Sequence, residues 1–147
     1  HNYFGWKQDL KDLIKKYNIE NKVYIINSRK PPEHLSIINL ADIGIALYRP
    51  SSINNFFCAP NRIYEFTGLG IPSILPNFNG MKFFEEKYHC FKTCDPLSPK
   101  SIANSIEFLL KEKNWMKIKE GSQKFYQENG DYIGKLDKIL NKIEKNN

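Results

Sequence analysis

Residues 59–74 hold the pattern best suited to chemistry, with the sequence APNRIYEFTGLGIPSI. It predicts a loop, a helix that begins at Pro60 and ends before Gly70, and an apolar strand over 72–75. Ala59 has no side-chain group that could cap the first turn of this helix. The backbone N–H groups of that turn are therefore left for a ligand. A helix start at the carboxyl end of a strand suits an anionic group such as a diphosphate.

Glu65 and Arg62 are the charged side chains of this predicted helix. Glu65 follows Pro60 by just over one turn, where a carboxylate can accept two hydrogen bonds from vicinal hydroxyls such as those of a ribose. The alternative is a solvated glutamate paired with Arg62, three residues earlier. The residues alone favour the pair, and Arg62 itself could face either phosphate or water.

Other catalytic patterns are missing from the sequence. It contains no GxxxxGK, GxSxG, HExxH or GxGxxG motif and no paired carboxylates in a promising loop. His34 and His89 are interpreted as surface or helix-end residues. Cys58, Cys90 and Cys94 have spacings that match neither a zinc site nor a disulfide framework, so we expect no metal and a reducing, cytoplasmic location.

The surrounding elements alternate between strands and helices, which predicts a parallel sheet flanked by helices. Strands are expected over 23–26, 42–47 and 72–75, with a weak one over 90–93; helices are expected over 7–17, from 31–33 onward, from Pro60 and over 81–87. The first three strands should lie parallel in one sheet. Residues 48–59 are rich in Pro, Ser and Asn and predict a loop.

The last third of the sequence is predicted to be all helix. Ser98 should cap a helix over 99–111, a second follows around 115–126, and a third is expected near 131–143. The length of 147 residues fits one domain, and no internal repeat or linker is visible. We therefore expect a single domain over residues 1–147.

Residues 59–74 resemble the PxKxxEYxAxGxPV signature of retaining glycosyltransferases with the GT-B fold, particularly those of family 4 that build capsules and lipopolysaccharide O-antigens. The similarity continues upstream over 17–23 and Ala41-Asp42-Ile43, and downstream over Asp95-Pro96 and 102–106, so it covers nearly the whole chain. It implies an α/β fold: the Rossmann-like, donor-binding C-terminal domain of a GT-B enzyme, with a parallel sheet flanked by helices and an all-helical C-terminal end.

The resemblance also implies residue roles. Glu65 would hold the ribose of the nucleotide, and Arg62 stands where the family often has Lys or Arg. Ser28 and Arg29 follow the first expected strand, in the region that usually touches the base through the backbone. The donor-nucleotide contacts are thus expected at Ser28, Arg29, Pro60, Asn61, Arg62 and Glu65.

One departure from the family pattern concerns the donor sugar. Many members have a second glutamate eight residues before the first, and Phe57 occupies that position here. The preceding loop must then contact sugar or phosphate differently, with Arg49, Asn54, Asn55, Phe57 and Cys58 as candidates. The two basic residues with which the family neutralises the diphosphate lie upstream of the residues present.

The function implied is retaining, hexosyltransferase-type transfer from a nucleoside-diphosphate sugar, UDP more than GDP, to a saccharide or lipid-linked acceptor, without a further cofactor. The acceptor-binding N-terminal domain would be absent from this chain, which would begin part-way through the donor-binding domain and be inactive alone. The alternatives are a GT-B-like sugar-nucleotide epimerase and a non-catalytic nucleotide-binding or interaction domain.

The formal net charge is +6, with lysines concentrated at 15–16, 111–119 and 135–145. They alternate with acids, as on solvated helix faces. A second interpretation is attraction to anionic phospholipid or to a phosphorylated ligand, and hence peripheral contact with the inner face of the cell membrane. Nucleic acid is not expected as a partner, because no basic stripe is interleaved with aromatic residues.

Overall fold

The computed structural model describes residues 5–131 together with residues 134, 136 and 141. The chain divides into two compact units, residues 1–34 and residues 35–147, and each is described by itself. The expected single domain over 1–147 therefore stays a prediction. Among the described residues, no helix is both long enough and apolar enough to cross a membrane.

The first unit contains helix α1 (Gly5–Lys16), close to the helix predicted over 7–17. Two residues after its last residue, Asn18 adopts the left-handed conformation with φ of 52°. The strand predicted over 23–26 is wrong: this segment is extended but belongs to no strand, and Tyr24 is 79% exposed. A β-branched run becomes a strand only where a neighbouring strand receives its hydrogen bonds, and the described residues provide none for this one. Helix α2 (Glu33–Ile38) crosses the division between the units.

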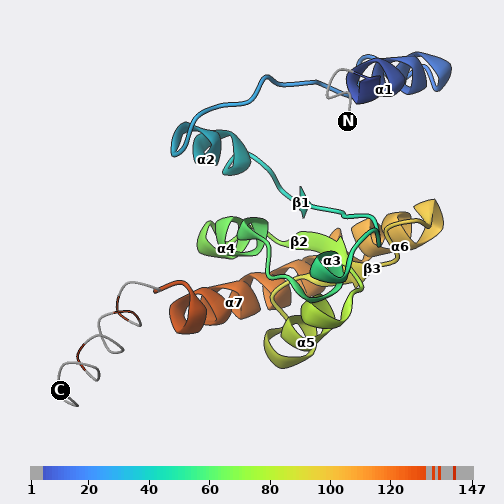
Figure 1. The fold of residues 1–147 in the computed structure, drawn as a ribbon. Helices are drawn as coiled ribbons and strands as arrows, with labels where there is room; N and C mark the ends of the chain where they lie inside the picture. The colour runs from blue at the N-terminus through green and yellow to red at the C-terminus, as the bar shows by residue number, and fades with distance from the viewer. Residues whose placement is uncertain (1–4, 132–133, 135, 137–140, 142–147) are drawn as a thin grey trace. The chain divides into compact units, whose positions relative to one another are not determined.

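The second unit is built on a three-stranded sheet of β1 (Gly44–Ile45), β2 (Ser73–Pro76) and β3 (Lys92–Cys94), in the order β1-β2-β3 (Figure 1). Both pairings are parallel, with Gly44 opposite Ser73 and Ile74 opposite Lys92. The parallel pairing predicted for the strands within 42–47 and 72–75 is confirmed. The weak strand expected over 90–93 forms slightly later in the chain.

Between β1 and residue 131 the structure describes five helices of this unit, and most match the sequence predictions. They are α3 (Ile53–Phe57), α4 (Asn61–Gly68), α5 (Asn79–Tyr88), α6 (Pro99–Leu109) and α7 (Glu112–Asn129). Ser98 caps α6 as predicted, because its hydroxyl accepts a hydrogen bond from the Ser101 N–H. The helix expected near 131–143 falls mostly outside the described residues.

Helix α3 corrects the prediction of a continuous loop over 48–59. Its single turn forms because the Ser52 hydroxyl accepts a hydrogen bond from the Asn55 N–H at 3.3 Å, which satisfies one of the first N–H groups. The sequence contains this cap, but the nearby Pro, Ser and Asn residues are equally typical of a loop.

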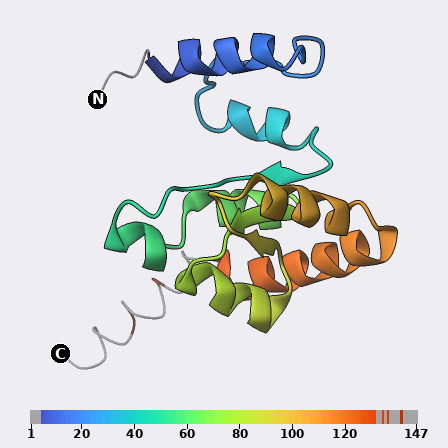
Figure 2. The same cartoon turned by 90° about the vertical axis from the view of Figure 1, so that its right-hand side faces the viewer.

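Apolar side chains cover both faces of the sheet. Successive residues of β2 point to opposite sides, so Leu75 and Ile74 belong to different clusters. On one face Leu75 joins the cluster of Ile63, Met81, Tyr88, Cys90, Phe91 and Phe125, contributed largely by α4, α5 and α7. On the other face Ile74 joins Cys94, Leu109 of α6 and Ile118 of α7. Helices α5 and α6 accordingly lie on opposite sides of the sheet (Figure 2). A strand buried on both faces explains why residues 71–75, apart from Ser73, are apolar without strong alternation.

Helix α7 lies against α4, α5 and α6, and at Gly121 it leaves no room for a side chain. A Cβ atom at this position would lie 2.2 Å from the Tyr88 carbonyl oxygen and 2.6 Å from that of His89. One residue further, the buried Ser122 hydroxyl donates to the Cys90 carbonyl oxygen at 2.8 Å. The backbone of α7 therefore touches the turn that connects α5 with β3.

Candidate functional site

The start of α4 is the structural feature around which the candidate site is built. Pro60 is its N-cap, with extended backbone angles (φ −68°, ψ 149°), and makes no side-chain capping hydrogen bond. Proline has no N–H of its own, and Ala59 has no polar side chain. The first turn thus begins without a side-chain cap, as the sequence predicts, and presents the positive end of a helix dipole.

Glu65 and Arg62 form an ion pair on α4, with 2.5 Å between Oε2 and Nη1. The side chain of Arg62 is 45% exposed and that of Glu65 is 22% exposed. An exposed pair three residues apart contributes little to folding stability. The ion pair that was the alternative interpretation of the spacing is present in the structure. Contact of Glu65 with a ribose stays a prediction.

Glu65 also lines a pocket of about 650 Å³ between α4 and α7. Its polar lining includes Asn61 and Glu65 from α4 and Asn129 from α7, and the rings of Tyr64 and Tyr126 form part of its walls. The volume lies within the range usual for small-molecule sites, and aromatic walls with a few convergent polar groups are typical of them. Three of the predicted nucleotide contacts, Asn61, Arg62 and Glu65, thus lie on the same helix, two of them in the pocket wall.

The loop that precedes α4 uses its polar side chains largely for its own folding. The Asn55 amide donates to the Arg49 carbonyl oxygen at 2.8 Å and to the Ser51 hydroxyl at 3.1 Å. Asn54 and Phe57 are exposed on α3, and the half-buried Cys58 thiol contacts the Asn55 carbonyl oxygen at 3.8 Å. The five residues predicted to contact sugar or phosphate lie in this one segment, and Asn55 and Cys58 make their hydrogen bonds within it.

Tyr48 is a polar residue near α4 that is not among the residues predicted from the sequence. It directly follows the strand predicted over 42–47 and is half-buried. Burial raises the pKa of its hydroxyl, and the Arg62 guanidinium opposes this rise, while Cys58 and Glu65 add to it. Those influences place Tyr48 within electrostatic range of Arg62, Cys58 and Glu65. A hydroxyl three residues after the end of β1, near the edge where parallel sheets bind ligands, is the signal that could have identified it.

Ser28 and Arg29, the two predicted base contacts, lie in the first unit. Both are exposed there and belong to no helix or strand. Their predicted role through backbone groups stays a prediction.

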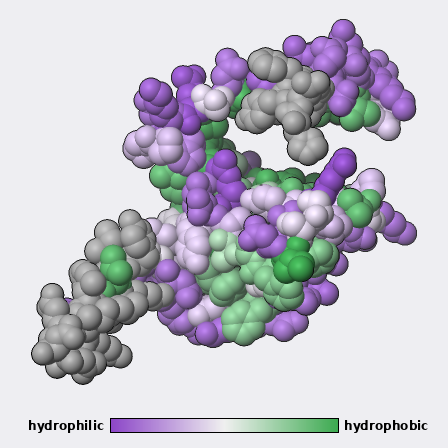
Figure 3. Space-filling view, viewed as in Figure 1, coloured by the Kyte–Doolittle hydropathy of each residue, from purple (hydrophilic) through white to green (hydrophobic). Residues whose placement is uncertain are grey.

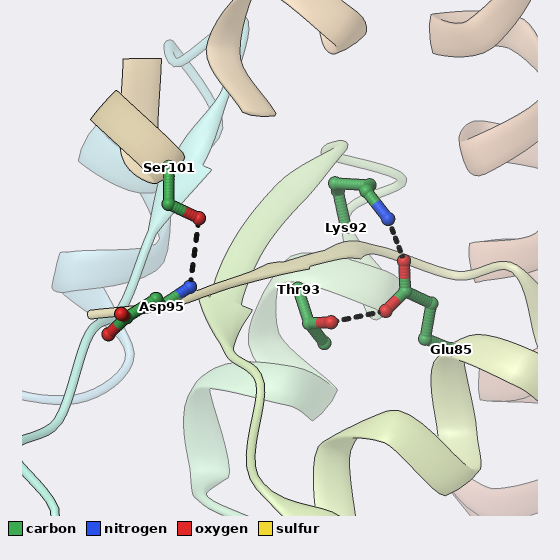
Figure 4. Close-up of polar contacts among 5 residues, drawn as sticks. All are labelled: Glu85, Lys92, Thr93, Asp95 and Ser101. Atoms are coloured by element: carbon green, nitrogen blue, oxygen red, sulfur yellow. Dashed lines mark hydrogen bonds and ion pairs between the residues drawn. The ribbon is translucent and has the colours of Figure 1, made fainter. Parts of the chain in front are cut away.

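A second polar cluster, also missed by the sequence analysis, joins α5 to β3 (Figure 4). The Glu85 carboxylate accepts a hydrogen bond from Lys92 Nζ at 2.6 Å and another from the Thr93 hydroxyl. Nearby, the Asp95 N–H donates to the Ser101 hydroxyl at 3.0 Å and so connects β3 with α6. These contacts join neighbouring elements and account for the cluster structurally. Within the described part of the chain, no three His, Cys, Asp or Glu side chains gather as a metal site would require.

Comparison with known proteins gives one informative likeness. No family model and no curated protein matches the sequence. A solved structure of sucrose-phosphate synthase from Thermosynechococcus elongatus is similar to this chain, with a TM-score of 0.61 and 18% sequence identity over 90% of this chain and 34% of that one. The chain thus spans about a third of that structure. The likeness confirms the predicted fold class, a parallel sheet flanked by helices of the GT-B C-terminal kind with helices at its C-terminal end.

Proposed function

We propose that this chain is the donor-binding domain of a glycosyltransferase that uses a nucleoside-diphosphate sugar. The observation that carries the proposal is the position of Glu65: it lies on a helix that starts without a side-chain cap after β1, and it lines a pocket of small-molecule size. The fold shared with sucrose-phosphate synthase is consistent with this proposal. The signature over residues 59–74 supports the family 4 type.

The chemistry proposed is transfer with retention, in which the bond between the anomeric carbon and the diphosphate breaks and a bond to the acceptor oxygen forms, while the acceptor hydroxyl gives its proton to the leaving diphosphate. Negative charge grows on the leaving diphosphate, so N–H groups and cations aimed at it stabilise the transition state. The first turn of α4 and Arg62, with Arg49 in the preceding loop, are the groups of this chain proposed for that role. Glu65 would fix the nucleoside through its ribose hydroxyls.

Further details of the proposal come from the resemblance to capsule and O-antigen enzymes. The donor is proposed to be a UDP-hexose rather than a GDP-hexose, and the acceptor a saccharide or lipid-linked oligosaccharide at the cytoplasmic side of a membrane. Because the chain spans about a third of the sucrose-phosphate synthase structure, an acceptor-binding domain is proposed as its partner. We therefore expect these 147 residues to bind nucleotide weakly and to transfer no sugar.

Calorimetric titration of the purified chain with UDP, GDP and NAD tests the proposal. We expect heat of binding with UDP and weaker or equal binding of GDP, and none with NAD. The Glu65→Ala variant, titrated in parallel, reports whether binding occurs at the proposed pocket. A folded chain that binds NAD most tightly, or that binds no nucleoside diphosphate at all, would refute a donor-binding role.

A further inference from the structure

The pocket between α4 and α7 combines aromatic and amide side chains with two glycines. Besides Glu65, its lining includes Gly68 from α4 and, at the end of α7, Tyr126, Asn129 and Gly130. In Figure 3 the most hydrophobic surface lies over α3 and α5, whereas the surface where α4 approaches α7 is paler, as mixed aromatic and polar residues make it. The lining therefore suits a ligand that is partly aromatic and partly polar.

The two glycines leave room for the ring of Tyr126 in the pocket wall. A Cβ atom at Gly68 would lie 2.8 Å from Cε2 of that ring, and one at Gly130 would lie 2.8 Å from its Cδ2. Neither glycine has a positive φ, so the backbone conformation does not require glycine at either position. A larger side chain at either place would displace the ring or occupy the pocket. The two glycines thus admit an aromatic ring to the wall and keep the space beside it open.

The ring of Tyr126 offers a flat surface to a ligand. It is 43% exposed, whereas its neighbour Phe125 is fully buried in the core. Planar heteroaromatic rings stack well on aromatic side chains of this kind. A nucleobase is such a ring and is attached to a ribose, and Glu65, which is proposed to bind the ribose, lines the same pocket. The pocket therefore provides a stacking surface for a base beside the residue proposed for its sugar.

The amide of Asn129 is held in one orientation. Its Nδ2 donates a hydrogen bond to the Phe125 carbonyl oxygen at 3.0 Å, and the reverse orientation would set two oxygens against each other. In the part of the chain that the structure describes, no donor contacts the remaining atom, Oδ1. An amide oxygen only accepts hydrogen bonds, so this side chain can recognise a ligand through an N–H group of that ligand.

We propose that Asn129 selects the base of the donor nucleotide: the base stacks on Tyr126, and Asn129 Oδ1 accepts a hydrogen bond from its ring N–H. The inference rests on the proposed function, because it takes the ligand to be a nucleoside diphosphate. Uracil and guanine each have a ring N–H, whereas cytosine, which has nearly the size and shape of uracil, has a lone pair at the corresponding nitrogen. Asn129 thus favours UDP over CDP. It adds a side chain of the second unit to the backbone contacts expected at Ser28 and Arg29.

Calorimetric titration of the 147-residue chain with UDP and with CDP tests the proposal. The wild type should bind UDP about tenfold more tightly than CDP, because a buried acceptor left facing a lone pair loses its hydrogen bond. Asn129→Ala should bring the two affinities within about threefold of each other, mainly by weakening UDP. Tyr126→Ala should weaken both nucleotides about tenfold and leave their ratio near the wild-type value, since every base can stack. A merely structural role of Asn129 would change both affinities equally.

The matched control is Asn114→Ala. The Asn114 amide donates to the Phe108 carbonyl oxygen at 2.9 Å near the start of α7, and Asn114 does not line the pocket. The control therefore loses the same kind of hydrogen bond and should keep both affinities.

The outcomes separate this inference from the proposed function. If the wild type binds UDP and CDP equally, or if Asn129→Ala keeps the wild-type ratio, the assignment of Asn129 is wrong while the donor-binding role stands. An equal change of the ratio in Asn114→Ala also overturns the assignment. If the folded wild type binds neither nucleotide, the proposed function fails and the inference fails with it. Melting temperatures of all variants report whether folding is intact.

Discussion

Two regions of the second unit differ in how far their side chains are buried. Where α7 meets residues 88–91, Cys90, Phe91 and Phe125 are fully buried and the helix backbone touches the turn at Gly121. Where α4 follows β1, Arg62 is half-exposed, Tyr48 is half-buried and Glu65 borders a pocket. The apolar core is therefore concentrated where α7 meets residues 88–91, whereas polar side chains stay accessible near the start of α4.

The largest expected effect separates two phenylalanines, one from each side. Phe125→Ala should lower the free energy of unfolding by about 3–5 kcal/mol, because the ring is fully buried and contacts Tyr64, Phe84 and Tyr88. The matched change Phe57→Ala should alter it by less than about 0.5 kcal/mol, since that ring is exposed. Urea unfolding measures both, and equal losses would contradict the distinction between the two sides.

Two helical glycines provide the next comparison. Gly121→Ala should destabilise the fold by about 2–3 kcal/mol, because the new methyl group would meet backbone carbonyls that cannot move independently. At Gly68 of α4 the methyl group would meet the ring of Tyr126, which is 43% exposed and able to rotate away. Gly68→Ala should therefore change stability by less than about 1 kcal/mol. Thermal unfolding of both variants compares them, and a larger loss at Gly68 would show that the pocket side is the more rigid.

A substitution on the side with the pocket should change the affinity for ligand rather than the stability of the fold. Glu65→Ala should weaken UDP binding at least about tenfold and leave the melting temperature of the unliganded chain nearly unchanged, because charge-assisted hydrogen bonds to ribose are lost while an exposed ion pair contributes little to folding. Glu65→Gln should retain part of the affinity, since an amide oxygen can still accept.

The control ligand for Glu65 is a 2′,3′-dideoxy nucleotide, which lacks the proposed hydroxyl partners. Wild type and Glu65→Ala should bind it equally in calorimetry. If the substitution weakens this ligand as much as the natural nucleotide, Glu65 acts by holding Arg62 or the pocket wall, and the ribose assignment is wrong.

The smallest expected effect concerns how the free energy of unfolding changes above pH 9. Burial raises the pKa of the Cys90 thiol from 9.0 to about 12. Above pH 9 the unfolded chain loses this proton while the folded chain keeps it, so stability falls as pH rises from 9 towards 12, by at most about 1.4 kcal/mol per pH unit. Unfolding curves at pH 8 and 10 should therefore converge more for Cys90→Ala than for the wild type. Parallel pH dependence of the two proteins would contradict the burial effect.

The sequence predicts elements set by local signals better than those that depend on residues elsewhere in the chain. Helical periodicity and the Ser98 cap locate α6 and α7, and the apolar run at 71–75 locates β2, because these signals are local. The strand predicted over 23–26 fails because a strand also depends on a neighbour that the sequence pattern does not specify. Helix α3 is missed because its residues suit a loop as well as a single capped turn.

Some features of the candidate site can likewise be predicted from the sequence, and others cannot. The uncapped start of α4 and the Arg62–Glu65 pair follow from residue types and spacing along one helix. The pocket between α4 and α7 and the position of Tyr48 depend on residues that are far apart in the sequence, so periodicity cannot predict them.

The bonds at Glu85 have a consequence for the order of folding. Lys92 and Thr93 lie only seven and eight residues from Glu85, whereas the bond from Ser122 to Cys90 spans 32 residues and that from Trp115 to Asp42 spans 73. Short loops close at a lower entropic cost than long ones. We therefore expect helix α5 and strand β3 to pair early in the folding of this unit, and α7 to pack over their connecting turn later.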